Sequence, residues 1–110
     1  MSKDLQRMMK QAQKMAAEMQ RAQEELAQET FAGSAGGGAV KVTVSGDQQI
    51  ERVEIDPDIF EGAPDQDDIE MLADAVTAAA NEALEKARAA HAAALGPLAG
   101  GLGGIGLPGS

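Results

Sequence analysis

Apolar side chains recur every three or four residues along the first quarter of the chain. This a/d heptad spacing, unbroken over three heptads, predicts an amphipathic helix over residues 3–28. Good helix formers dominate the segment, and it contains neither Gly nor Pro. A helix of this length would extend about 40 Å, so we expect it to project from the body or to lie against another helix. The apolar seam is formed by Leu5, Met8, Ala12, Met15, Met19, Ala22 and Leu26.

Strict alternation replaces the helical spacing in the next part of the chain. Apolar and polar residues take turns before Gly46, which indicates a half-buried strand, and a second alternating run follows this glycine. Residues near Phe31 are a candidate third strand, because an isolated hairpin is only marginally stable. We therefore predict an antiparallel meander of two or three strands over about residues 30–55. The buried face of its central run is predicted to consist of Val40, Val42 and Val44.

A second long helix is predicted over residues 66–95. Asp56-Pro57 ends the sheet, because a residue before proline prefers extended geometry. Several aspartates then cluster where the helix begins, at the positive end of its dipole. The glycine-rich residues 96–110 are predicted to be a flexible tail. Residues 1–95 are thus expected to form one α+β domain with a long N-terminal helix, a small antiparallel β-meander and a long C-terminal helix.

The apolar content is small for a self-sufficient domain. Leu, Ile, Val and Phe account for 20 of the 110 residues, and 22 others are Ala. Small domains bury a smaller share of their surface and are marginal alone. A second copy would supply buried area, so we predict a homodimer with projecting helices, in which the methionine-containing seam is a packing surface.

Charge is distributed unevenly over a chain of net charge −9. Residues 1–30 carry five basic and five acidic side chains, whereas residues 47–74 carry eleven acidic side chains against Arg52 alone. Nucleic acid would be repelled by the chain as a whole, so DNA binding must rest on a local patch. Two interpretations of the basic residues in the first helix are open: a solvated face with ion pairs one turn apart, or a row of phosphate contacts. These residues fall at heptad positions c and f, opposite the seam: Lys3, Arg7, Lys10, Lys14 and Arg21.

Catalytic and metal-binding residues do not form a recognisable pattern. The absence of Cys excludes disulfides, thiolate metal sites and thiol nucleophiles. His91, the single histidine, is surrounded by alanines, which offer it neither a second metal ligand nor a catalytic partner. Gly33 and Gly36–Gly38 are interpreted as a flexible turn, because they precede a strand, whereas a phosphate-binding loop opens a helix. We therefore expect no enzymatic activity, no cofactor, no metal and no small-molecule substrate.

Hydropathy along the chain indicates a cytoplasmic protein. The N-terminus lacks the apolar stretch of a signal peptide. No apolar run approaches the roughly 18 residues that a membrane span needs. We expect no association with a membrane.

Five short motifs, taken in their order, resemble the YbaB/EbfC family of bacterial nucleoid-associated proteins. Together, the motifs span essentially the whole chain. The resemblance implies a homodimer whose helices project as arms, and duplex DNA binding with little sequence specificity in the nucleoid. The motifs are MMKQAQKM (Met8–Met15), GGAVKVTV (Gly37–Val44), VEIDP (Val53–Pro57), ANEAL (Ala80–Leu84) and GLPG (Gly106–Gly109).

The resemblance also implies partners among DNA repair or recombination proteins. The basic positions of the first helix are carried over as candidate DNA contacts. A second function stays open: a protein–protein adaptor or chaperone-like dimer that uses the Met/Ala helix seams. The basic row favours DNA, whereas the acidic total charge and the two aromatic residues favour a protein partner.

Overall fold

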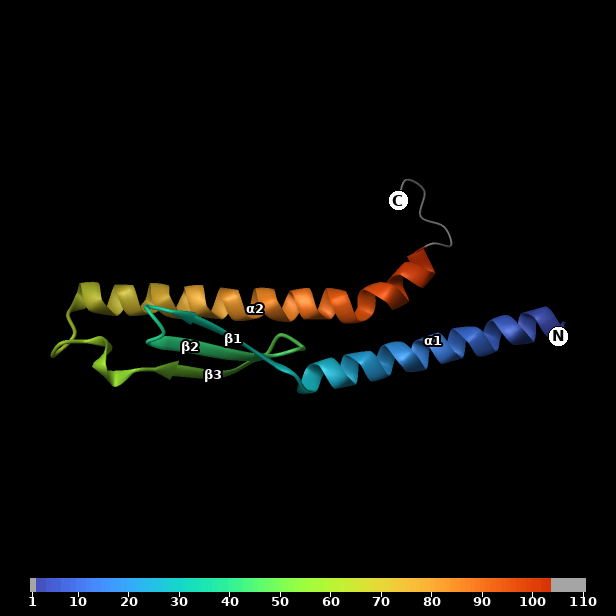
Figure 1. Ribbon diagram of the computed structural model, residues 1–110, viewed down its shortest axis with the longest axis horizontal. Coiled ribbons are helices and arrows are strands. Elements are labelled where there is room, and N and C mark those ends of the chain that lie inside the picture. Colours follow the sequence, from blue (N-terminus) through green and yellow to red (C-terminus); the bar gives the residue numbers. More distant parts are fainter. Residues whose placement is uncertain (1, 104–110) are drawn as a thin grey trace.

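The computed structural model describes residues 2–103. Two long helices and a three-stranded antiparallel sheet make up this part of the chain, so the predicted α+β fold is confirmed (Figure 1). The candidate third strand near Phe31 is present and comes first in the sheet. The elements are α1 (Lys3–Gln28), β1 (Thr30–Ala35), β2 (Val40–Ser45), β3 (Ile50–Ile55), a 3-10 turn (Pro57–Ile59) and α2 (Gln66–Gly103).

Helix α1 begins and ends where the sequence predicts. The hydroxyl of Ser2 accepts a hydrogen bond from the backbone N–H of Leu5 (3.2 Å) and so caps the first turn. At the other end, Glu29 adopts an extended conformation and leads directly into β1. The helix runs away from the sheet (Figure 1), and the molecule measures 76 × 30 × 18 Å. Its radius of gyration is 21.2 Å, well above the about 13 Å of a compact chain of this length. The predicted projecting helix is confirmed.

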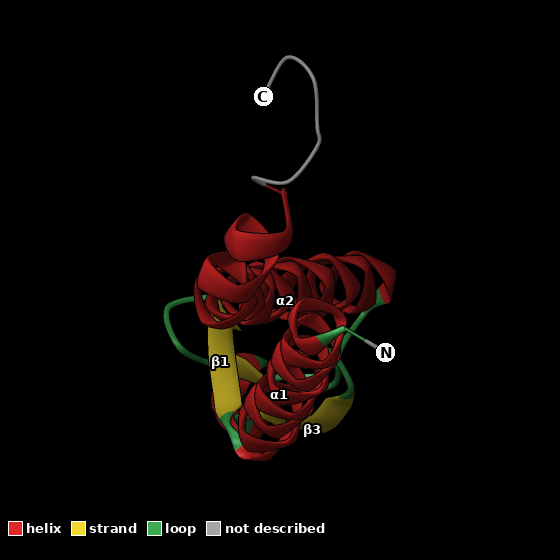
Figure 2. Ribbon diagram, turned by 90° about the vertical axis from the view of Figure 1, so that its right-hand side faces the viewer, coloured by secondary structure: helices red, strands yellow, loops and turns green. Residues whose placement is uncertain are grey.

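The three strands follow one another in the order β1-β2-β3, and α2 covers one face of the sheet. The central strand β2 turns its alternate valines toward this helix, where their side chains are fully buried as predicted. Figure 2 shows β1 directly beside α2, with β3 farther away. The core on this face consists of Val40, Val42, Val44, Ala79, Ala83 and Ala87.

The interpretation of Gly33 as part of a turn is wrong. This residue lies inside β1 and is buried against α2. A Cβ atom on it would collide with the backbone oxygen of Ala79 and would lie 2.7 Å from the backbone nitrogen of Ala83. The glycine therefore allows the strand to touch the helix backbone. The turn itself consists of Gly36–Gly38, all with positive φ, as the glycine-rich run predicted.

Helix α2 is longer than predicted. Its start agrees with the sequence: the backbone N–H of Asp68 donates to the Asp65 carboxylate (2.8 Å), and the N–H of Asp65 donates back to the Asp68 carboxylate (3.1 Å). The helix does not end near residue 95 but continues to Gly103, so it includes the beginning of the predicted tail. Gly96 and Pro97 are the poorest helix formers, so composition alone predicted an end that the backbone does not have. Residues 104–110 lie outside the described part, where the flexible tail stays a prediction.

Candidate nucleic-acid interface

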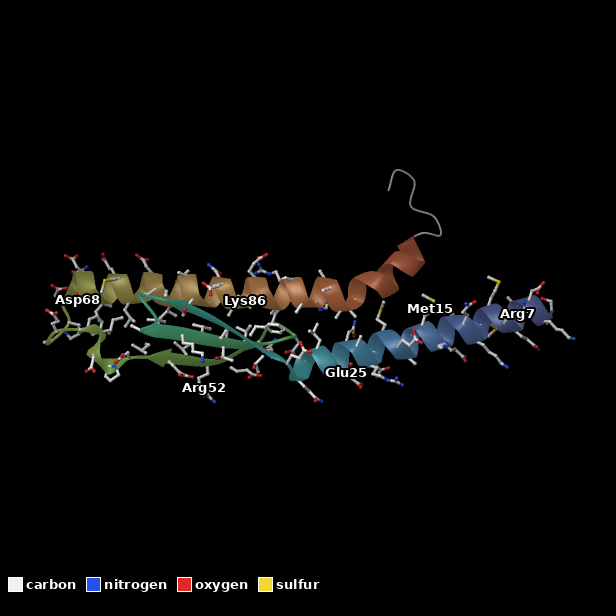
Figure 3. The ribbon with its side chains drawn as sticks, in the orientation of Figure 1. Arg7, Met15, Glu25, Arg52, Asp68 and Lys86 are labelled. Carbon is white, nitrogen blue, oxygen red and sulfur yellow. The ribbon has the colours of Figure 1, made fainter. Side chains whose placement is uncertain are left out.

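The basic residues of α1 form one continuous row on the arm. Because α1 is regular from Lys3 to Gln28, a rotation of about 100° per residue places all five within an arc of about 60°. Every one of them is exposed to solvent. Figure 3 shows Arg7 near the free end of the arm, far from the sheet. We call this row the basic stripe: Lys3, Arg7, Lys10, Lys14 and Arg21.

Basic residues outside α1 are mostly occupied by neighbouring groups. Within the described residues, ion pairs join Arg52 to Glu54 (3.3 Å), Lys86 to Glu82 (3.4 Å) and Arg88 to Glu85 (3.1 Å). The ammonium group of Lys86 also donates to the backbone oxygen of Ala32 on β1 (2.9 Å), which ties α2 to the sheet. This contact spans 54 positions, so no local pattern signals it. These cations are partly neutralised and are poorer candidates for phosphate contacts.

Most acidic residues of the body lie away from the arm. Eleven acidic side chains fall in residues 47–74, from the turn between β2 and β3, through β3 and the Pro57–Ile59 turn, to the start of α2. Asp47 is an exception, because the backbone N–H of the adjacent Gly46 donates to the backbone oxygen of Glu29, directly after α1 (3.0 Å). Figure 3 places Asp68 and Arg7 at opposite ends of the long axis, which measures 76 Å. Charges many Debye lengths apart interact weakly, because this length is about 8 Å in physiological salt. The outer half of the arm therefore meets the condition of a basic patch separated from the acidic body.

The apolar seam of α1 is covered only along its inner half, mainly by α2 and to a smaller extent by β2. Leu26 is buried, and Met15 and Met19 are half-buried. Toward the free end, by contrast, Leu5 is 44% exposed and Met8 is 66% exposed. The predicted packing surface thus has a partner within the protomer only along its inner half.

A second uncovered apolar surface lies on β3. Val53 is paired with Val42, and Ile55 with Val40, so these side chains share the sheet face that α2 covers. They are nevertheless 44% and 43% exposed, because α2 lies over β1 and β2. Ile50 extends this surface and is 55% exposed. The alternating pattern predicted the face on which these residues lie, but it carried no signal for which strand the helix would leave uncovered.

Residues 2–103 hold neither a candidate metal site nor a candidate membrane span. No three His, Asp or Glu side chains come together there in an arrangement that could hold a metal ion. No helix in the same part of the chain combines the length and apolarity needed to cross a membrane.

Comparisons with known proteins cover nearly the whole chain. The family model described as the YbaB/EbfC DNA-binding family matches residues 1–102. A nucleoid-associated protein of Acetivibrio thermocellus is 48% identical over 98 residues, which cover 89% of this chain and 83% of that protein. Another, from Streptomyces avermitilis, is 48% identical over 106 residues, which cover 96% and 90%. The crystal structure of uncharacterized protein HP0035 from Helicobacter pylori superimposes on this chain with a TM-score of 0.72 and a sequence identity of 16%. The superposition covers 90% of this chain and 98% of the HP0035 chain. At that identity the likeness concerns the fold alone.

Proposed function

The chain belongs to the YbaB/EbfC DNA-binding family, and from this premise we propose that it is a nucleoid protein that binds duplex DNA as a homodimer with little sequence specificity. The observation that carries the proposal is the basic stripe, which is continuous, exposed and remote from the acidic body. Lys and Arg side chains contact phosphates regardless of the bases between them. Used for phosphate contacts alone, the stripe would bind DNA without regard to sequence.

The homodimer is supported by surfaces that one protomer leaves uncovered. Apolar side chains on β3 stand beside the core without a cover, at an edge of the sheet with unpaired backbone groups. A second copy placed on this surface would extend the small core of valines and alanines. It would also supply a second arm, so that ten stripe cations could face one duplex.

A salt titration tests the proposal directly. Purified dimer is titrated against random-sequence duplex DNA at several salt concentrations. If all ten cations contact phosphates, the plot of log affinity against log salt has a slope of about −9, and if half do, about −4.5. Binding that is absent at low salt, or that is independent of salt, would contradict a phosphate-contact interface.

The alternative function is a protein adaptor or chaperone-like dimer. The observation in its favour is the exposed outer half of the seam, where Leu5 and Met8 have no partner surface within the protomer. Methionine suits such adaptable contacts. Failure to bind DNA in the titration, together with an intact dimer, would favour this function.

A further inference from the structure

The charge of α1 changes sign halfway along the helix. From residue 3 to residue 14 the helix carries the first four cations of the basic stripe against Asp4 alone. From residue 15 to its end at Gln28 it carries Arg21 against three glutamates. The outer half therefore has a net charge of +3 and the inner half of −2. This reversal divides the basic stripe into an outer part in a positively charged half of the helix and Arg21, which lies in a negatively charged half.

Arg21 lies among these three glutamates. On a helix, residues three and four positions apart are neighbours, and Glu18, Glu24 and Glu25 stand at these distances from Arg21. All four side chains are exposed. Glu24 in addition accepts a hydrogen bond from the side-chain amide of Gln20 (3.3 Å), which holds it on the outer surface of the helix. Figure 3 shows Glu25 close to the sheet, at the inner end of the arm.

We propose that Glu18, Glu24 and Glu25 confine the DNA duplex to the outer half of the arm. They compete with phosphates for Arg21 and repel a backbone that approaches the inner half. Contact is then made by Lys3, Arg7, Lys10 and Lys14, and Arg21 contributes nothing while the glutamates are charged. The inference rests on the proposed DNA-binding function and specifies where on the arm the duplex lies.

The dimensions of the arm agree with this division. The outer basic segment is about 17 Å long, more than the about 12 Å width of the major groove, so its cations can reach phosphates on both sides of a groove. The inner acidic segment adds a further length of about 20 Å before the sheet begins. It acts as a spacer that keeps the duplex away from the acidic body.

The test combines two sets of substitutions in the dimer, with random-sequence duplex DNA as the probe. Arg21→Gln alone should change affinity less than twofold and leave the salt slope unchanged. Neutralising the three glutamates as Glu18→Gln, Glu24→Gln and Glu25→Gln should raise affinity and steepen the slope by about 2, because one Arg21 per arm gains a phosphate. Adding Arg21→Gln to this variant should abolish the steepening. Gln is as good a helix former as Glu, so circular dichroism should stay unchanged.

A control of equal charge separates the local effect from the change in net charge. Glu61→Gln, Asp67→Asn and Glu70→Gln remove three negative charges at the far end of the molecule and should leave the slope unaltered. The inference is overturned if this control steepens the slope as much as the glutamate variant does, or if Arg21→Gln alone flattens it by about 2. Absence of binding by the wild-type dimer would instead refute the proposed function itself.

Discussion

Replacing Arg7, Lys10 and Lys14 together with Gln should largely abolish DNA binding and leave the fold intact. The three side chains lie on the exposed face of a helix, away from the seam, and Gln preserves helix propensity. The dimer loses six of its ten stripe cations. Only Lys3 then remains in the outer half of each arm.

The size of the effect follows from counterion release. With half of the stripe in use, five contacts give a slope of about −4.5, and a fourfold rise in salt lowers affinity about 500-fold. Loss of three of the five leaves a slope of about −1.8, and the same rise in salt then lowers affinity only about 12-fold. The repulsion from the acidic body is unchanged, so absolute affinity at low salt should also fall.

Fluorescence anisotropy with a labelled random duplex measures both quantities. Light scattering and circular dichroism verify that the dimer and its helices persist. The matched control changes Gln6, Gln11 and Gln13 to Ala in the same segment, which alters three polar side chains without altering charge. If the charge variant binds DNA with the affinity and slope of the wild type, the basic stripe is only a solvated surface, and the interface lies elsewhere.

Three further substitutions test the fold and the assembly. Gly33→Ala should destabilise the protein by about 3 kcal/mol in urea denaturation, at the upper end for overpacking, because the added Cβ atom collides with backbone. The control Ser34→Ala should change stability by less than about 0.5 kcal/mol. Equal effects of the two substitutions would contradict the close contact between β1 and α2. Val53→Asp should yield protomers of 11.3 kDa in light scattering, because it places a charge on the uncovered apolar face of β3. The control Arg52→Asp, on the opposite face of the sheet, should leave the dimer intact. A Val53→Asp protein that is still dimeric would rule out this face as the interface. Asp65→Ala removes the cap of α2 and should cost about 1 kcal/mol in thermal unfolding; an unchanged melting temperature would mean that the cap contributes nothing.

The sequence by itself determined the elements and the faces of α1 and β2. The a/d spacing without Gly or Pro predicted Lys3–Gln28, and the structure confirms both ends. Alternation predicted the valines of β2, which are fully buried. The position of the basic stripe opposite the seam also follows from helical periodicity. These features depend on backbone geometry within a few residues, so a local pattern is sufficient to reveal them.

The tertiary structure decided which of these faces is covered, and by what. Gly33 looks like a turn residue in sequence, and only the position of α2 explains why it cannot carry a Cβ atom. Val53 follows the same alternation as the buried valines, yet it is exposed because α2 lies over the other two strands. In the same way, Leu5 and Leu26 occupy equivalent seam positions but differ in burial, since only the inner end of α1 meets the body. Burial depends on contacts between residues far apart in the chain, and a periodic pattern records only that a face is apolar, not which element packs against it.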